Sequence, residues 1–258
     1  MLLAIDAGNT NTVFALFDGP TQIGVWRAVT HSQRTSDEYA VFLNSLMAQI
    51  GIHASDVTDA IIGSVVPDVN FNLLKLCREH FACDPLLVGA PNVETGIKVL
   101  IDRPEELGAD RLINAVAGVA LYQTPLLIID FGTATTFDVV DAQGHYCGGV
   151  IAPGINLSIR ALHMAAAKLP SVAVVRPAKV IATGTVTAIQ SGVFWGYVGM
   201  IEGLIARIKE EFAMPMTVVA TGGLSKLFVD SIPSIDEINT DMTLHGLSLI
   251  YERNRKDS

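Results

Sequence analysis

Short apolar runs separated by turn residues open the chain. They span Leu2–Ile5, Val13–Phe17 and Gly24–Val29, and Gly19-Pro20 lies between the second and the third. Apolar runs of this length, bounded by Gly, Pro and Asn, are typical of strands joined by tight turns. The N-terminal segment is therefore predicted to form an antiparallel three-stranded meander.

After the meander, helical and strand patterns alternate, which is typical of α/β proteins. Helices are predicted where apolar residues recur at helical spacing and turn residues bound them. The predicted strands are 60–66, 86–88, 126–130, 137–140, 148–151 and 216–220, and the predicted helices are 36–51, 67–81, 108–122, 153–168, 185–212 and 244–255.

Two segments of the chain resemble each other. The first reads LLAIDAGNTNTVFALFDG and the second reads LLIIDFGTATTFDVVDAQG, so each is an apolar run, a turn with an acid, and a second apolar run. At an offset of 124 positions the matched residues are Leu2 and Leu126, Asp6 and Asp130, Gly8 and Gly132, and Thr12 and Thr136. This repeat predicts a duplicated α/β fold with two domains, residues 1–115 and 116–258, and two similar turns that face each other across a cleft.

Composition narrows the possible partners. The chain has 258 residues, of which 50% are hydrophobic, and its 17 Lys and Arg against 26 Asp and Glu give a net charge of −9. This balance argues against nucleic acid or an anionic membrane as the main partner. The three cysteines form no CxxC pair, and the sequence shows neither a signal peptide nor a membrane span. We therefore expect a cytoplasmic protein.

The predicted helix 185–212 carries a stripe of glycines at positions 192, 196, 199 and 203. Their spacing puts all four on one face. Each glycine costs about 1 kcal/mol relative to alanine in a helix interior, so the stripe needs a reason. Two remain open: close packing within the domain, or a helix that lines a dimer interface or the cleft.

The first turn, Asp6 to Val13, has the parts of a phosphate-binding hairpin. Gly8 lets backbone amides point outward, Asn9 and Thr10 add neutral donors, and Asp6 can hold a hydrated magnesium ion. An ordinary β-turn uses the same residue types. The second turn, Asp130 to Thr136, repeats the pattern and favours phosphate binding at both.

Two further segments carry candidate chemistry. Gly222-Gly223 follows a predicted strand and could admit an adenine ring next to the backbone, although a plain helix-entry turn has the same sequence. Asp110 and Arg111 lie at a predicted helix start, where an acid is favoured by the helix dipole alone. Their functional interpretation is a proton acceptor for a substrate hydroxyl and a cation that holds an anionic group.

The motifs DAGNTNT, GADR, DFGTATT, TGTVTAIQSG and ATGG, in this order, closely resemble those of the type III pantothenate kinases. These enzymes belong to the acetate/sugar kinase–Hsp–actin superfamily, so the resemblance implies two actin-like, ribonuclease H-like domains. It also implies ATP-dependent phosphorylation of pantothenate to 4'-phosphopantothenate, the first step of coenzyme A biosynthesis, in a homodimer. The implied cofactors are Mg²⁺ and a monovalent cation, K⁺ or NH₄⁺.

The resemblance also implies roles for single residues. Asp110 would be the catalytic proton acceptor, and Asp130 and Asp6 would be metal ligands. The implied ATP contacts are Asp6, Ala7, Gly8, Asn9, Thr10, Asn11, Thr12, Val13, Thr133, Gly222 and Gly223. The implied pantothenate contacts are Gly108, Ala109, Asp110, Arg111 and Thr185.

The chain departs from the family pattern at a few positions. Ile101 and Arg103 stand where many members have an aromatic residue and Asn, and Gly184 stands where members often have Asn. Two alternatives therefore remain. One is a superfamily kinase acting on another small hydroxylated substrate, against which the GADR motif argues. The other is a catalytically weak regulatory or accessory homologue.

Overall fold

The computed structural model describes residues 1–165 and 169–255. The chain folds into two compact units, each with one sheet. Unit 1 comprises residues 1–97, 102–120 and 242–258, and unit 2 comprises residues 98–101 and 121–241. The predicted end of the helix 153–168 lies outside the described residues.

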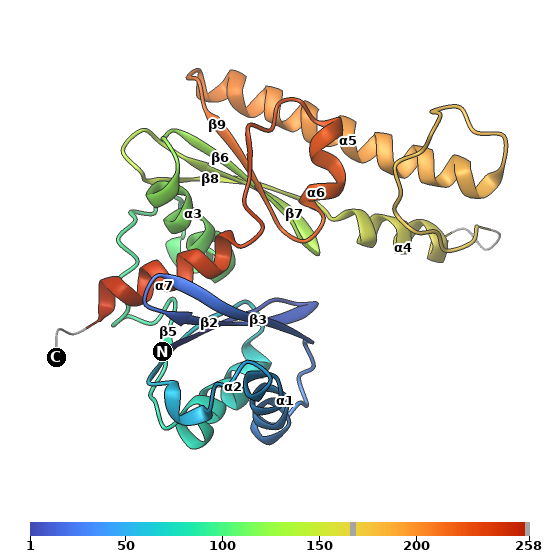
Figure 1. Ribbon diagram of the computed structural model, residues 1–258. Coiled ribbons are helices and arrows are strands. Elements are labelled where there is room, and N and C mark those ends of the chain that lie inside the picture. Colours follow the sequence, from blue (N-terminus) through green and yellow to red (C-terminus); the bar gives the residue numbers. More distant parts are fainter. Residues whose placement is uncertain (166–168, 256–258) are drawn as a thin grey trace. The chain divides into compact units, whose positions relative to one another are not determined.

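Unit 1 is a five-stranded mixed sheet with helices on both faces. Its strands are β1 (Leu2–Ala7), β2 (Asn11–Asp18), β3 (Thr21–Val29), β4 (Asp59–Ser64) and β5 (Leu86–Leu87), in the order β3-β2-β1-β4-β5. Its helices are α1 (Ser36–Ala48), α2 (Pro67–His80), α3 (Ala109–Leu121) and α7 (Met242–Asn254), with short 3₁₀ turns at Ala54–Asp56 and Pro104–Glu106. Figure 1 shows α1 and α2 on one face of this sheet and α7 on the other.

Local sequence accounts for these elements. The first three strands are antiparallel and β1–β4–β5 are parallel, which confirms the predicted meander followed by α/β alternation. Thr35 caps α1 through a capping box with Glu38, and Pro67 begins α2, where a missing N–H costs nothing. Alternate apolar residues of β1 enter two different clusters, one with α1 and α2 and one with α3 and α7.

Unit 2 repeats the strand topology of unit 1. Its strands are β6 (Leu126–Phe131), β7 (Ala134–Val140), β8 (Tyr146–Pro153), β9 (Thr217–Thr221) and β10 (Glu237–Ile238), in the order β10-β9-β6-β7-β8. Its helices are α4 (Ile155–Ala165), α5 (Thr185–Phe212) and α6 (Ser225–Phe228), with a 3₁₀ turn at Val229–Ser231. Both units thus have an antiparallel meander joined to two parallel strands, as the duplication predicts.

The two structural units differ from the sequence-predicted domains at α7. The sequence places this helix in the second half, at 116–258, whereas in the structure it belongs to unit 1. Thr243 Oγ1 donates to Asn114 Oδ1 at 2.8 Å, and a Cβ at Gly246 would lie 2.3 Å from the Ile113 carbonyl oxygen. Close backbone packing of α7 on α3 therefore returns the chain end to the first sheet.

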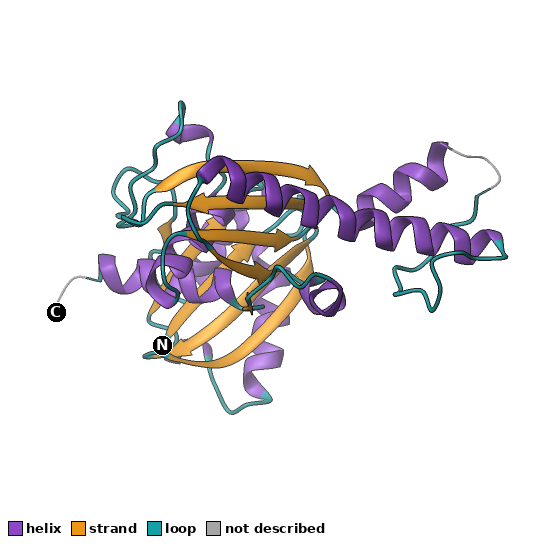
Figure 2. Cartoon of the chain, turned by 90° about the horizontal axis from the view of Figure 1, so that it is seen from above, coloured by secondary structure: helices purple, strands orange, loops and turns teal. Residues whose placement is uncertain are grey.

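Helix α5 has two distinct parts within unit 2. Its later residues, among them Phe194, Val198 and Ile201, pack with the sheet in one hydrophobic cluster. Its N-terminal part extends past the ends of the strands together with α4 (Figures 1 and 2). No helix among the described residues is long and apolar enough to span a membrane.

Candidate active site

The first turn is held from its inner side by threonine hydroxyls. β1 ends at Ala7 and β2 begins at Asn11, and the Gly8 N–H donates to the Asn11 carbonyl at 3.1 Å. Thr30 Oγ1 donates to the Gly8 carbonyl at 2.7 Å and lies 2.9 Å from Thr12 Oγ1, which is buried. These bonds fix the turn.

The other side of the first turn is available for a ligand. Asn9, Thr10 and Asn11 are exposed, while Asp6, Gly8 and Val13 are half-buried and Ala7 is buried. Asp6 is next to Gly63 in the parallel β1–β4 register, so it lies at the carboxyl ends of two adjacent parallel strands. Ligand sites of open α/β sheets are found at this end.

The structure connects Asp110 with the first turn through Val65. The Val65 N–H donates to the Ala7 carbonyl at 3.1 Å, directly after β4 ends. A Cβ at Gly108 would lie 3.7 Å from Val65 Cγ1 and 2.7 Å from Asp110 Oδ1. Gly108 therefore lies between the residue that follows β4 and the Asp110 carboxylate, with too little room for a larger side chain. Three residues that the sequence placed in one site, Ala7, Gly108 and Asp110, do lie close together within unit 1.

The environment of Asp110 raises its pKa. Burial raises the pKa, and the Arg111 N–H, which donates to Oδ1 at 2.8 Å, and the Arg111 guanidinium lower it, with burial prevailing. Asp110 lies in the first turn of α3, so the helix dipole also favours a negative charge there. A partly buried carboxylate with a raised pKa is a suitable proton acceptor.

The second turn is one residue shorter than the first. Ala7 pairs with Thr12 in the first hairpin, whereas Phe131 pairs with Thr135 in the second. Accordingly, the Gly132 N–H donates to Ala134, two residues on, at 3.1 Å. The sequence match of Thr12 with Thr136 is therefore wrong: a gapless comparison does not detect a residue missing inside a turn.

The structural counterpart of Thr12 is Thr135. Both side chains are fully buried, and Thr135 Oγ1 lies 2.5 Å from the Tyr197 hydroxyl on α5. Burial of its ring raises the pKa of Tyr197 to about 12, so this hydroxyl stays protonated and can donate. Each hairpin therefore has a buried threonine beside its turn. In unit 1, Thr12 hydrogen-bonds Thr30, directly after β3, and in unit 2, Thr135 hydrogen-bonds Tyr197 on α5.

Asp130 and Gly222 lie against each other in unit 2. Asp130 pairs with Thr221 in the parallel β6–β9 register, and Gly222 follows with a φ of +87°. A Cβ at Gly222 would lie 2.4 Å from Asp130 Oδ1 and 2.7 Å from the Phe131 nitrogen. Only glycine fits here. Gly223, by contrast, is exposed with nothing within 4 Å of an added Cβ.

Sequence reasoning missed Gly154, which supports the second turn. Its N–H donates to the Thr133 carbonyl at 3.2 Å, and a Cβ at this position would lie 2.3 Å from that oxygen. Thr133 itself is exposed. The signal in the sequence is the pair Pro153-Gly154 at the end of β8, which breaks a strand but does not reveal its long-range partner. Thr30 was missed for the same reason.

Thr185 begins α5 and is exposed at the end of the helix that extends beyond the strands (Figure 1). Gly184 precedes it in an extended conformation, and its carbonyl accepts the Thr187 hydroxyl at 3.0 Å. Thr185 belongs to unit 2 and Asp110 to unit 1. Ile101 also belongs to unit 2, where its Cγ2 lies 3.7 Å from a Cβ built at Gly148.

Known proteins match this chain over most or all of its length. A family model described as type III pantothenate kinase matches residues 2–207. The chain belongs to this family. It is 59% identical to the type III pantothenate kinase of Paramagnetospirillum magneticum over 254 residues, covering 98% of both chains. It is 56% identical to that of Rhodospirillum rubrum, covering 100% of both chains.

Solved structures agree with this family assignment at the level of the fold. The activator of the 2-hydroxyisocaproyl-CoA dehydratase from Clostridium difficile, which was solved with bound ADPNP, superimposes with a TM-score of 0.55. It is 12% identical and covers 100% of this chain and 98% of its own. The chain therefore shares the overall fold of this structure, and its two similar five-stranded sheets confirm the duplicated α/β fold that the sequence predicts.

Proposed function

We propose that this chain transfers the terminal phosphate of ATP to a hydroxyl of pantothenate, which forms 4'-phosphopantothenate in the first step of coenzyme A biosynthesis. The observation that carries the proposal is the position of Asp110. Contacts through Gly108 and Val65 connect its partly buried carboxylate with Ala7, at the start of the phosphate turn. A proton acceptor and a phosphate site are thereby built into one unit.

The first turn has the donors that ATP phosphates need. Exposed amide and hydroxyl groups of Asn9, Thr10 and Asn11 surround a backbone turn at Gly8, and none of these groups carries a charge. Such turns bind phosphate oxygens through oriented backbone N–H groups. Among the described residues, no three His, Cys, Asp or Glu side chains form a ready metal cage. In this proposal Asp6 and the substrate phosphates would hold the magnesium ion, which is commonly bound by one or two carboxylates and phosphate oxygens.

Magnesium bound there would offset the phosphate charge, which is the main requirement of phosphoryl transfer. The protein's own contribution is to position the two substrates and to move one proton. Asp110 orients the pantothenate hydroxyl and accepts its proton, while Arg111 holds an anionic group of the substrate. Ala109 and Gly108 shape the wall beside them, and Thr185 supplies a further substrate contact.

By the resemblance, three residues of unit 2 would also contact the nucleotide. Thr133 contacts a phosphate, and the backbone at Gly222 and Gly223 receives the adenosine. The Asp130 carboxylate, which lies against Gly222, holds a monovalent cation such as K⁺ or NH₄⁺. Such a cation supplies positive charge near the phosphates, which the lysine-free turns do not provide.

One coupled assay tests the reaction and its rivals. ADP release is measured with ATP, Mg²⁺ and pantothenate, with K⁺, NH₄⁺ or neither present, and then with other small hydroxylated substrates. We expect pantothenate-dependent ADP release that K⁺ or NH₄⁺ increases. No pantothenate-dependent release under any cation, from protein whose fold is confirmed by circular dichroism, would contradict the proposal. Release with another substrate alone would favour a different kinase activity, and none at all an accessory homologue.

We also propose that the enzyme is a homodimer formed through the glycine stripe of α5, and that it is cytoplasmic, in keeping with its three free cysteines. A Cβ at Gly192, Gly196 or Gly199 would meet no atom of the described residues within 4 Å, which favours an interface over close packing within unit 2 for these three positions. A bare helix face lets a second backbone approach closely. The exposed apolar residues Met164, Val180, Ile181 and Val186 lie on α4, on the segment before α5 and on α5 itself.

Sedimentation equilibrium tests the dimer. The double substitution Gly192→Leu with Gly199→Leu adds two side chains to the open face, and we expect it to shift the protein to a monomer. Ala48→Leu, which adds a leucine to the exposed end of α1, is the matched control. A double variant that sediments like the wild type would exclude the stripe as the interface.

A further inference from the structure

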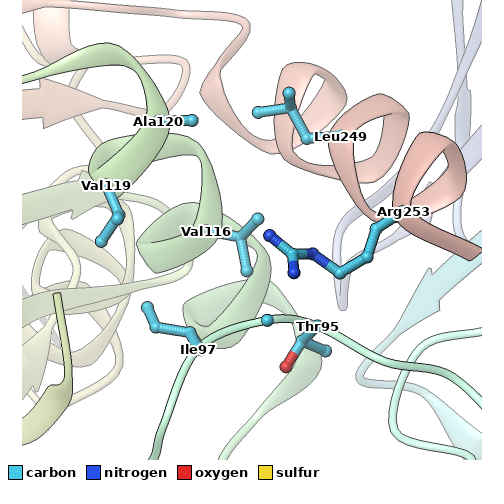
Figure 3. A pocket seen from close by; sticks show the side chains of 8 residues that line it. Thr95, Ile97, Val116, Val119, Ala120, Leu249 and Arg253 are labelled. Carbon is cyan, nitrogen blue, oxygen red and sulfur yellow. The ribbon is translucent and has the colours of Figure 1, made fainter.

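A second pocket lies in unit 1, away from the phosphate turn. It has a volume of about 490 Å³ and is formed by α3, α7 and residues 95–97 (Figure 3). Small-molecule sites in proteins have volumes of roughly this size, about 300–1,000 Å³. Its walls are mainly aliphatic, with Val116 and Val119 from α3, Leu249 from α7, and Ile97. Val119 and Leu249 are 37% and 36% exposed, so an occupant would cover apolar surface.

Arg253 brings a positive charge to this apolar pocket. In Figure 3 its guanidinium reaches from α7 across the pocket toward Val116. It lies so close to the backbone at Gly96 that a Cβ there would be 2.1 Å from Cζ. Gly96 has a φ of +74°, and the next residue on α7, Asn254, hydrogen-bonds both the N–H and the carbonyl of Glu94 at 2.8 Å. The arginine is thus held in place by its surroundings.

No acid in the described part of the chain neutralises Arg253. The neighbouring Glu252 pairs with Arg255, at 3.6 Å, and not with Arg253. Within residues 1–165 and 169–255, no hydrogen bond or ion pair of the Arg253 guanidinium is found. A guanidinium is a fork of N–H donors that matches a carboxylate in two parallel hydrogen bonds. The pocket therefore combines an apolar wall with an arginine that has no acidic partner among the described residues.

The pocket is separate from the proposed catalytic residues. Asp110 lies in the first turn of α3 and Ala120, another lining residue, near its end. At 1.5 Å per residue, the ten intervening steps place the two about 15 Å apart along the helix. None of the residues lining this pocket belongs to the first turn or to the GADR motif.

We propose that this pocket is a second small-molecule site, which binds a carboxylate with a short aliphatic body. Arg253 receives the carboxylate, and Val116, Val119 and Leu249 cover the aliphatic part. A carboxylate suits the site better than a phosphate monoester, because a single guanidinium neutralises one negative charge and leaves the second charge of a phosphate dianion in apolar surroundings. The site is independent of the proposed kinase activity.

The probe for the test is hexanoate, titrated into the full chain and followed by methyl NMR shifts and by calorimetry. A ligand of this size should bind with a dissociation constant of about 1–10 mM. Arg253→Gln should weaken binding at least about tenfold. Arg255→Gln, directly after the end of α7 and in a residue paired with Glu252, is the matched control and should bind like the wild type. Ala120→Phe keeps the arginine and fills the cavity, so it should also abolish binding.

Three comparisons give the proposal definite outcomes. Hexanol lacks the carboxylate and should bind much more weakly than hexanoate. Saturating ATP and pantothenate should not displace hexanoate, and Arg111→Gln should leave its binding unchanged, which separates this site from the kinase site. Binding that is absent up to 50 mM, equal in Arg253→Gln, or displaced by pantothenate would overturn the proposal. So would tighter binding of hexyl phosphate than of hexanoate.

Discussion

Replacing Asp110 with asparagine separates catalysis from folding. Asparagine keeps the shape of the side chain, and its Oδ1 can still accept the Arg111 N–H that Asp110 receives at 2.8 Å. What it removes is the negative charge. Because burial raises the pKa of Asp110, the folded protein pays a free-energy cost to keep this carboxyl ionised at neutral pH. The amide has no such cost.

The stability of the variant has a definite sign. A carboxyl with a raised pKa in the folded state binds its proton more tightly there than in the unfolded chain. Its contribution to the free energy of unfolding is therefore largest at low pH and declines as pH rises from its usual value through the raised one. At pH 7, Asp110→Asn should consequently be as stable as the wild type or more stable. Thermal unfolding measures this.

The loss of activity should be large. Proton transfer by a positioned base is worth about 10²–10⁴-fold, so kcat should fall by that factor, which corresponds to about 2.7–5.5 kcal/mol of barrier. Coupled ADP release at saturating ATP and pantothenate measures it. Asp102→Asn removes an exposed charge from the segment before α3 and serves as the control with unchanged kcat. A stable Asp110→Asn enzyme with kcat within about threefold of the wild type would refute the role of Asp110.

Three other results are expected. The pH profile of kcat/KM should show an acid limb above the usual range for aspartate, because the ionised form of Asp110 is active and burial raises its pKa, and the limb should disappear in Asp110→Asn. Thr30→Val removes the hydroxyl that bonds Gly8 and Thr12, so it should lower the free energy of unfolding by about 1–3 kcal/mol and raise KM for ATP. Gly154→Ala forces a Cβ to 2.3 Å from the Thr133 carbonyl and should cost about 1–3 kcal/mol, with a raised KM for ATP, whereas Gly223→Ala, which meets nothing, should not destabilise the fold. Thermal unfolding and initial-rate kinetics check both variants, and unchanged KM values would show that these contacts do not hold the turns.

Local patterns sufficed for most of the fold. The meander, the helix that Pro67 begins and the whole of α5 follow from apolar periodicity and from turn or capping residues within a few positions. The short strand β10 has too few residues to show a period, so the sequence did not predict it. The sequence also did not predict that α7 packs in unit 1, because the close approach of Gly246 to Ile113 brings together residues that are far apart in the chain.

The candidate site divides in the same way. Asp6 and Asp130 lie next to recognisable turns and Asp110 lies at a recognisable helix start, so the sequence identified all three as candidates. The residues that hold those turns, Thr30 and Gly154, are ordinary in their own local sequence and become visible only through long-range hydrogen bonds. A threonine or glycine at a strand end can have many different structural roles. Here the hydrogen bonds from Thr30 to the Gly8 carbonyl and from Gly154 to the Thr133 carbonyl identify the role of each residue.

The shorter second turn changes what the repeat means for the proposed mechanism. Between its last paired residues the first hairpin leaves four residues, 8–11, and the second leaves three, 132–134. The first turn can therefore surround a chain of phosphates with several donors, whereas the second can offer one hydroxyl and a few amides. Asp130 lies against the Gly222 backbone because it pairs with Thr221 across the parallel β6–β9 register, and the proposed cation site rests on this carboxylate. In the proposed mechanism, the shared strand topology accounts for the matching positions of Asp6 and Asp130, and the difference in turn length accounts for the different number of donors beside them.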